Sequence, residues 1–419
     1  MSAVPDSVCV VGGGLAAVST AAELRAQGFT GRVTLLSAEE HPPYDRPPLS
    51  KDVLLGRITY DEAALRPAQW YTDHDIDLYL GERVVSLDPA GPTVLTERGE
   101  QVRAGAVVLA TGGVPRRLPA ALVRPERTHV LRTLDDARGL RAALAPGTRV
   151  LCVGAGLIGA EAAAAAGALG ASVTVIDPVG VPLVPLLGEQ IATALHGLHH
   201  SNGVRTLQGA LGQVHEGSDG TLTCTVDTAG GPEKVTADVL LTGIGTDPDP
   251  SLAADAGLET DRGVLVDARR ATSAPGVYAV GDLAQAHPGT EERPQHGEHW
   301  ENALKDAGAA AASILGNPVP AQGAPWFWSD RHGVHLEAVG TMSEADHTVV
   351  RGDVDSGSFT VFGLRGDRCV AAASLDRPHD IRAARRLVDR AVPVEADALA
   401  DIVRPLKSLL RRPAAVRSR

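Results

Sequence analysis

Two glycine-rich turns in the chain have the residue types and spacing that hold a phosphate-bearing ligand. The apolar run Val8–Val11 leads into Gly12-Gly-Gly14, and Val150–Val153 leads into Gly154-Ala-Gly156-Leu-Ile-Gly159. Such glycines between a strand and a helix permit a tight turn and let the backbone approach a pyrophosphate, whose charge the helix N-terminus favours. The sequence therefore predicts two dinucleotide sites, which indicates an oxidoreductase in which one nucleotide gives electrons to the other.

An acidic residue at the end of the next strand would bind the adenosine ribose of each dinucleotide. Asp177 holds this position in the second unit, and no Arg or Lys lies between Asp177 and Arg205. A carboxylate repels a 2′-phosphate by roughly 4 kcal/mol per unit charge near 4 Å at surface-like dielectric, which predicts NADH rather than NADPH. In the first unit residues 37–38 carry no acid, so Glu39 is the expected ribose ligand and Glu40 stays open as the alternative.

The elements that must position these residues form an approximate internal repeat. Each glycine turn opens an alanine-rich run and then reaches a β-branched strand, Arg32–Leu36 in the first unit and Ser172–Ile176 in the second. In the first turn Ala17 takes the third small position, where the helix meets the strand. Two further strand-like runs, Val107–Ala110 and Val239–Thr242, end in glycine-bearing turns. This βαβ pattern predicts an α/β fold of mainly parallel sheets with right-handed crossovers.

Composition and charge exclude several classes of protein. The 419 residues exceed one ordinary core, and a content of 44% hydrophobic and 21% charged residues predicts folded domains rather than disorder. A formal net charge of −12 argues against nucleic acid as the main partner. The four cysteines, Cys9, Cys152, Cys224 and Cys369, form no CxxC pair, which argues against a zinc ribbon, a disulfide scaffold and a dithiol redox centre. We expect no metal site.

One stretch is long and apolar enough to suggest a membrane span. From Val150 to Ile176 the only charged side chain is Glu161. The glycines at its start and the β-branched run at its end instead predict a buried strand–turn–helix–strand. The N-terminus carries Asp6 and no positively charged segment, which argues against a signal peptide. We therefore expect a cytoplasmic protein with no membrane partner.

Five segments occur together and in order, and their combination is specific: Tyr44–Lys51, Ala110–Gly112, Gly154–Glu161, Tyr278–Asp282 and Trp326–Asp330. Over about residues 5–400 the chain resembles the FAD- and NADH-dependent ferredoxin reductases of bacterial oxygenase systems, the family of putidaredoxin reductase and the reductases of aromatic-ring dioxygenases. The resemblance implies a glutathione-reductase-like architecture of two Rossmann-like dinucleotide-binding domains and a smaller C-terminal α+β domain. Residues 1–116 and 246–322 would form a discontinuous FAD-binding domain, residues 117–245 an NAD-binding domain, and residues 323–419 the C-terminal domain with a basic tail.

The resemblance also implies roles for individual side chains. Lys51 and Glu161 would meet near the flavin and the nicotinamide, and Trp328 would lie at the ferredoxin-facing edge of the cofactor, so these three are the expected catalytic residues. An acid inside an alanine run is costly to bury unpaired, which agrees with an ion pair for Glu161. Asp282 would bind the ribityl chain of FAD. The expected FAD-binding residues are Gly12, Gly14, Ala16, Ala17, Glu39, Arg46, Lys51, Ala110, Thr111, Gly112, Arg132, Gly281, Asp282 and Trp300. The expected NAD-binding residues are Gly154, Gly156, Leu157, Ile158, Gly159, Glu161, Asp177, Gly243 and Gly245.

The chain departs from the family pattern at a few positions. His296 stands where the family usually has Arg, Lys305-Asp306 where it has Gln-Gly, and Arg331 where it has Gln. These differences bear on the identity of the partner more than on the chemistry.

The resemblance implies that electrons pass from NADH through FAD to a small iron–sulfur ferredoxin, which feeds a haem monooxygenase or a Rieske dioxygenase. Related disulfide reductases use a cysteine pair beside the flavin, and NADH peroxidases use a cysteine that would fall near Pro43–Tyr44; the chain has neither. Two alternatives stay open: an NADH oxidase-type flavoprotein that reduces oxygen, and a redox signalling flavoprotein resembling apoptosis-inducing factor.

Charge is distributed unevenly along the chain. Residues 377–419 contain eleven basic and five acidic residues, a net charge of +6, which leaves −18 on residues 1–376. Ferredoxins are typically acidic, so a basic surface built partly from Arg382, Arg385 and Arg386 would attract such a partner.

Overall fold

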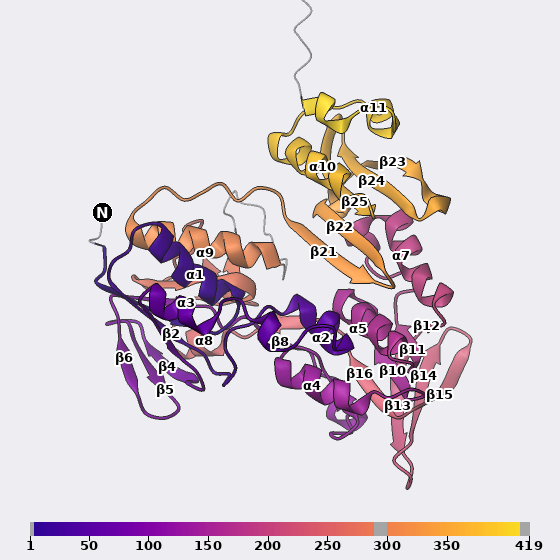
Figure 1. The fold of residues 1–419 in the computed structure, drawn as a ribbon, viewed down its shortest axis with the longest axis horizontal. Helices are drawn as coiled ribbons and strands as arrows, with labels where there is room; N and C mark the ends of the chain where they lie inside the picture. The colour runs from indigo at the N-terminus through magenta and orange to yellow at the C-terminus, as the bar shows by residue number, and fades with distance from the viewer. Residues whose placement is uncertain (1–3, 289–299, 411–419) are drawn as a thin grey trace, which may run out of the picture. The chain divides into compact units, whose positions relative to one another are not determined.

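The computed structural model describes residues 4–288 and 300–410, and the chain folds into two compact units (Figure 1). The first comprises Met1–Leu49, Ile58–Arg116 and Thr246–Gln322, and the second comprises Ser50–Arg57, Arg117–Gly245 and Gly323–Arg419. The chain passes from one unit to the other after residues 116, 245 and 322.

The segment Ser50–Arg57 belongs to the second unit, although the sequence analysis included it in the first domain. Its helix α2 (Asp52–Leu55) packs there because Arg141 donates to the Leu54 carbonyl oxygen at 2.7 Å. Lys51, which precedes α2, forms an ion pair with Glu161 of the same unit. These are contacts between distant parts of the chain, which a reading of local pattern does not reveal.

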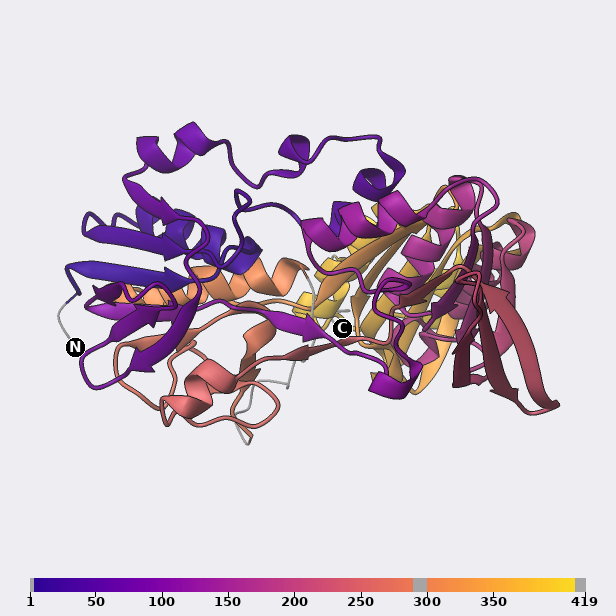
Figure 2. The same ribbon diagram turned by 90° about the horizontal axis from the view of Figure 1, so that it is seen from below.

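The first unit is built on a parallel sheet in the order β19-β7-β1-β2-β3. Side chains of β1 alternate between its two faces, as the period of a strand requires. Val8 and Val10 pack with helices α1 and α9, which lie side by side (Figure 2, indigo and orange), whereas Cys9 and Val11 pack with residues of β4 and β5. The bounds are β1 (Ser7–Val11), β2 (Arg32–Leu36), β3 (Ile76–Tyr79), β4 (Val84–Asp88), β5 (Thr93–Thr96), β6 (Gln101–Arg103), β7 (Ala106–Leu109), β8 (Gly113–Pro115), β17 (Thr246–Pro248), β18 (Val264–Val266), β19 (Val277–Ala279), β20 (Ala284–Ala286), α1 (Leu15–Ala26), α3 (Ala68–Asp73), α8 (Ser251–Asp255) and α9 (Trp300–Leu315).

The second unit repeats this design with a parallel sheet in the order β12-β11-β10-β16-β9. The stretch from Val150 to Ile176 forms β10, α5 and β11, as predicted. Within residues 4–288 and 300–410, none of the helices has the length and hydropathy of a membrane span. The bounds are β9 (Thr128–His129), β10 (Arg149–Val153), β11 (Ser172–Asp177), β12 (Arg205–Gln208), β13 (Ala210–Glu216), β14 (Leu222–Thr228), β15 (Gly231–Ala237), β16 (Val239–Thr242), α4 (Leu134–Ala143), α5 (Leu157–Ala168), α6 (Val184–Leu187) and α7 (Glu189–Ser201).

The end of the chain adds an antiparallel sheet in the order β21-β22-β25-β24-β23 to the second unit. Its two faces are both covered: Phe359 packs with residues of α7, and Phe362 packs with residues of α10. The bounds are β21 (Trp326–Arg331), β22 (Val334–Gly340), β23 (His347–Asp353), β24 (Ser358–Arg365), β25 (Arg368–Leu375), α10 (Pro378–Arg390) and α11 (Ala396–Ala400). The predicted class, two Rossmann-like α/β units and a smaller C-terminal α+β domain, is confirmed.

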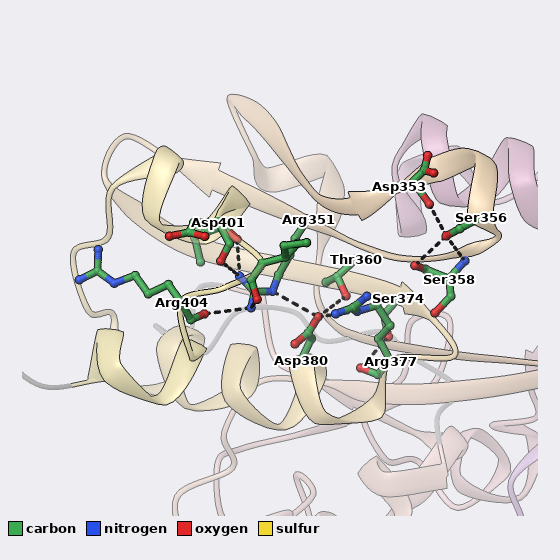
Figure 3. Close-up of polar contacts among 12 residues, drawn as sticks. Arg351, Asp353, Ser356, Ser358, Thr360, Ser374, Arg377, Asp380, Asp401 and Arg404 are labelled. Carbon is green, nitrogen blue, oxygen red and sulfur yellow. Dashed lines mark hydrogen bonds and ion pairs between the residues drawn. The ribbon is translucent and has the colours of Figure 1, made fainter.

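A buried arginine holds the last turns of the chain against this sheet (Figure 3). Arg351 of β23 is 4% exposed, and its guanidinium donates to the carbonyl oxygens of Leu399, Asp401, Ile402 and Arg404. Its Nε lies 3.5 Å from Oδ2 of Asp380 on α10. The segment after α11 is therefore fixed by the sheet up to at least Arg404.

Candidate functional site

The first glycine turn joins β1 to α1 and is closely packed at Gly12 but open at Gly14. Gly12 has a φ of +137°, and a Cβ there would lie 2.2 Å from the Ala110 carbonyl oxygen, so only glycine fits. At Gly14, the N-cap residue of α1, the nearest atom to a Cβ would be NH1 of Arg46, 3.7 Å away. A guanidinium beside a helix N-terminus suits a pyrophosphate, so these residues fit the phosphates of FAD. Ala16 and Ala17 follow as buried residues of α1.

Glu39 is held in place after β2. Its Oε2 accepts from the Tyr44 hydroxyl at 2.5 Å, and its Oε1 lies 3.6 Å from NH2 of Arg46. Glu40 is exposed. The fixed carboxylate favours Glu39 over Glu40 as the ribose ligand, and Tyr44 is a partner that the sequence analysis did not name.

The remaining candidates of the first unit lie at the carboxyl ends of adjacent strands. Residues 110–112 directly follow β7, and Gly281-Asp282 follow the end of β19; the two strands are neighbours in the sheet that contains β1. Ligands of open α/β sheets bind at this edge. Trp300, at the start of α9, donates from Nε1 to Oδ1 of Asp45 at 2.8 Å.

The second glycine turn is packed on one side and open on the other. A Cβ at Gly154 would lie 2.4 Å from the Gly243 carbonyl oxygen, and one at Gly159 would lie 2.3 Å from the Gly154 carbonyl oxygen. Gly156 is the N-cap residue of α5, and a Cβ there would meet no other described residue within 4 Å. The open position at the helix N-terminus fits the pyrophosphate of NAD. Leu157 and Ile158 form the first turn of α5, and Gly245, with a φ of +102°, follows β16.

Asp177 is the last residue of β11, and its carboxylate accepts hydrogen bonds from two backbone N–H groups. Its Oδ2 accepts from the Ala155 N–H and its Oδ1 from the Val179 N–H, each at 2.9 Å. Each carboxylate oxygen has a second lone pair, so Asp177 can still accept from a ribose hydroxyl. The residue therefore shapes the glycine turn as well as offering a ribose contact.

Glu161 lies on α5 at the centre of a buried polar cluster. Its Oε1 lies 3.0 Å from Nζ of Lys51 and accepts from the Ser329 hydroxyl at 2.6 Å, while Oε2 accepts from the Ser50 hydroxyl at 2.5 Å. Lys51 Nζ also lies 5.9 Å from the ring centroid of Trp328. The structure thus brings the three predicted catalytic residues together within one unit. Ser50 and Ser329 were missed, although both lie in the sequence segments that carried the family resemblance.

Trp328 stacks on Trp326, with ring centroids 5.2 Å apart and an interplanar angle of 26°. Trp326 donates from Nε1 to Oε2 of Glu337 at 3.3 Å, and Oε1 of Glu337 lies 3.1 Å from Nε2 of His335. Burial lowers the pKa of His335, but Asp330 and Glu337 outweigh this effect and raise the pKa above 6.5. One side of the β21–β22 hairpin therefore carries two stacked indoles beside a charged network.

The other side of β21 carries Arg331, which is 4% exposed. Among the residues that the structure describes, Nε and NH1 of Arg331 have no hydrogen-bond partner. Burial lowers its pKa to about 10, against the opposing charge of Glu161. Burial and the Arg331 charge lower the pKa of His199 to about 3 and also lower that of His332, whose Nε2 lies 3.0 Å from Nδ1 of His199. The same two effects lower the pKa of His196.

Arg132 and two positions at which the chain differs from the family pattern, Lys305 and Asp306, form polar contacts with other residues. Arg132, expected at FAD, lies in the second unit before α4, where its N–H donates to Oδ2 of Asp136 at 3.0 Å. Lys305 forms an ion pair with Glu301 at 3.0 Å. Asp306 forms a buried ion pair with Arg270. His296 lies outside the described residues.

The cysteines are all buried and free. Burial raises the pKa of Cys9, Cys152 and Cys369 to about 12 and that of Cys224 to about 11. A thiol at such a pKa is not nucleophilic near neutral pH. These residues therefore act as small apolar core residues, and no group of three or more His, Cys, Asp or Glu in the described chain could hold a metal ion.

Comparison with known proteins gives consistent results over the whole chain. Residues 6–307 match the family described as pyridine nucleotide-disulphide oxidoreductase, and residues 326–410 match the reductase C-terminal domain. The chain is 38% identical over 406 residues to the anthranilate 1,2-dioxygenase system ferredoxin–NAD(+) reductase component of Burkholderia cepacia, covering 97% of this chain and 99% of that protein. It is 33% identical over 408 residues to putidaredoxin reductase of Pseudomonas putida, covering 97% of each.

Solved structures agree with this similarity. The covalent putidaredoxin reductase–putidaredoxin complex matches with a TM-score of 0.90 at 33% identity, covering 97% of this chain and 98% of that chain. The ferredoxin reductase for the CYP199A2 system from Rhodopseudomonas palustris matches with a TM-score of 0.90 at 31% identity, covering 97% and 100%.

Proposed function

The chain belongs to the pyridine nucleotide-disulphide oxidoreductases, among the ferredoxin–NAD(+) reductases, and we propose on this basis that it passes electrons from NADH through FAD to a small iron–sulfur ferredoxin. The observation that carries the proposal is the pair of glycine turns, one in each unit, each leading to a fixed carboxylate at the end of the next strand. Because the four cysteines are buried and unpaired, the chain has no dithiol to receive electrons internally. We therefore propose that the electrons pass to an acceptor outside the chain.

Different parts of the chain bind the two dinucleotides. In our proposal residues 1–116 and 246–322 bind FAD with Gly12, Gly14, Glu39, Arg46 and Asp282, and residues 117–245 bind NADH. The open position at Gly156 receives the pyrophosphate, and Asp177 binds the adenosine ribose and disfavours a 2′-phosphate. From residues 323–419, Ser329 donates a hydrogen bond to Glu161, and the Trp328 ring lies beside the Lys51 ammonium group.

FAD, when bound, supplies the electron transfer that links a two-electron donor to a one-electron acceptor. The chain supplies geometry and charge. The Lys51–Glu161 pair presents a positive and a negative group, and the Ser50 and Ser329 hydroxyls keep the Glu161 carboxylate in one orientation. A carboxylate fixed by several partners orients a neighbouring group at little further entropic cost, which is why we assign Glu161 and Lys51 to the positioning of the nicotinamide.

The relatives named above serve different oxygenases, an anthranilate dioxygenase and a cytochrome P450 system among them. We propose that the ferredoxin reduced by this protein likewise feeds an oxygenase, either a Rieske dioxygenase or a haem monooxygenase. Since NADH is the reductant, we also propose that the protein works in the cytoplasm.

The test is reduction of cytochrome c by NADH with and without an added 2Fe–2S ferredoxin. We expect turnover to require the ferredoxin, while ferricyanide, a small acceptor, is reduced without it. Rapid NADH-dependent oxygen consumption that ferredoxin does not change would instead favour an oxidase. Slow cytochrome c reduction with every ferredoxin tried would favour a signalling flavoprotein.

A further inference from the structure

A buried ion pair lies beside the turn that carries Asp282. Arg270 Nε lies 2.7 Å from Asp306 Oδ1, and the side chains are 12% and 11% exposed. The other carboxylate oxygen, Oδ2, accepts from the Gly281 N–H at 3.0 Å. One carboxylate on α9 therefore connects the Arg270 guanidinium to the backbone of the turn that follows β19.

Arg270 adopts a backbone conformation that costs free energy. Its φ is +61°, in the left-handed region that only glycine and a few short polar residues adopt readily. Its N–H donates to the Asp267 carbonyl oxygen at 2.9 Å, and its own carbonyl oxygen accepts from the Ala279 N–H at 3.1 Å. Such strain persists only where the surroundings determine the conformation, and it concentrates at functional sites. In this conformation the Arg270 guanidinium contacts Asp306, and the Arg270 carbonyl oxygen accepts from the last residue of β19.

The Gly281 turn is confined on its other side as well. Gly281 has a φ of +69°, and a Cβ there would lie 2.9 Å from Cβ of Ala16 on α1. The turn thus lies between Ala16 and Asp306. Burial raises the pKa of Asp306, Arg270 opposes this effect, and the nearby Asp282 carboxylate adds to it. Without Arg270 the pKa of Asp306 would rise further, and protonation would weaken the carboxyl as an acceptor for the Gly281 N–H.

We propose that Asp306 and Arg270 are positioning residues for FAD, which fix the Gly281 turn and so place Asp282 against the cofactor. The inference rests on the assignment of this turn to FAD in the proposed function. It also gives a role to Asp306, where the chain departs from the family pattern.

The test measures FAD release from the full-length holoprotein on dilution and FAD rebinding to the apoprotein, both by flavin fluorescence. Asp306→Asn keeps an acceptor for Gly281 but removes the ion pair, and Arg270→Gln removes it from the other side. We expect each to weaken FAD binding about tenfold or more, the range of a hydrogen bond to a charged group. Because the two residues act as a unit, the double variant should lose about as much as either single variant.

Two controls separate positioning from a general loss of stability. Asp77→Asn removes the exposed Arg32–Asp77 pair of the same unit, whose side chains are 65% and 46% exposed, and should leave FAD binding unchanged. The melting temperature with and without FAD is the second readout, since a positioning role predicts a smaller FAD-induced increase in the variants. If both variants melt lower by equal amounts with and without FAD and bind FAD as the wild type does, the inference is overturned. Ferredoxin-dependent turnover of the wild type tests the proposed function separately.

Discussion

Lys51 Nζ lies 3.0 Å from Glu161 Oε1 in an ion pair whose side chains are 14% and 5% exposed. Hydroxyls of Ser50 and Ser329 donate to the same carboxylate, so Glu161 has a full set of partners away from water. Removing one member of such a pair leaves a buried charge, whereas removing both leaves none. The free energy of unfolding should therefore respond differently to single and double replacement.

Glu161→Gln should destabilise the protein by about 3–5 kcal/mol, because it leaves Lys51 buried without its counter-charge. It should also slow reduction of the bound flavin by NADH, measured by stopped flow. The double variant Lys51→Met with Glu161→Gln should recover part of the stability but not the rate. Asp52→Asn is the matched control, since the Arg57–Asp52 pair is 67% and 48% exposed and should contribute under about 1 kcal/mol.

Asp177 should set the preference for NADH. We expect a kcat/KM for NADH well above that for NADPH, and a smaller difference in Asp177→Asn because the repulsion of the 2′-phosphate is lost. Asn has a single acceptor oxygen, so this variant also loses one bond to the Ala155 or Val179 N–H, and the KM for NADH should rise. Steady-state kinetics with both cofactors decide the matter, and equal kcat/KM values in the wild type would contradict the assignment.

The histidines around Arg331 should make the protein sensitive to acid. His199, His196 and His332 have folded pKa values below 6.5, so the native state binds fewer protons than the unfolded state below that pH. This contribution to stability is therefore fully present above about pH 6.5 and is lost as the pH falls. For His199 the loss continues to about pH 3, at up to ~1.4 kcal/mol per pH unit, and His196 and His332 act in the same direction. His199→Asn should flatten a plot of unfolding free energy against pH. His215→Asn, at an exposed position, is the control; a slope equal to that of the wild type in both variants would contradict the prediction.

Arg351 should be needed for the C-terminal domain. Arg351→Met removes its bonds to the carbonyl oxygens after α11 and its ion pair with Asp380, and we expect a loss of about 3 kcal/mol or more. The segment beyond Leu399 should also become sensitive to limited proteolysis. Arg365→Met, which removes a bond to Glu344 from a 51% exposed side chain, should cost far less.

The basic end of the chain should attract the ferredoxin. On α10 Arg382 and Arg386 are exposed whereas Arg385 is half-buried, so the first two are better tests of docking than the third. Charge reversal at Arg382 and Arg386 should raise the KM for ferredoxin and leave ferricyanide reduction by NADH unchanged, because a small acceptor needs no docking surface. Ferredoxin-dependent turnover of the wild type should also slow as ionic strength rises, since steering is screened over roughly 10 Å at 0.1 M. Wild-type behaviour of both variants would place the docking surface elsewhere.

The two glycine turns, the strands around them and the acid at the end of β11 could all be predicted from the amino-acid sequence. These features are local. A tight turn with positive φ requires glycine at Gly12 and Gly154, and the pattern of apolar side chains along each strand reflects which of its faces are buried. The absence of a cysteine pair was equally plain, since it needs only a count of residues and their spacing.

The pairing of the buried polar groups could not be predicted from the sequence and follows from how the elements pack. Ser329 reaches Glu161 from a strand 168 positions away, and Asp306 reaches the Gly281 turn from a separate helix. The same holds for residues 50–57, which the sequence assigned to the first domain and the fold places in the second unit. Local pattern encodes backbone conformation and the buried face of an element, but a buried charge finds its partner only when the elements pack, because its cost of burial is offset by whichever opposite charge the packing places there.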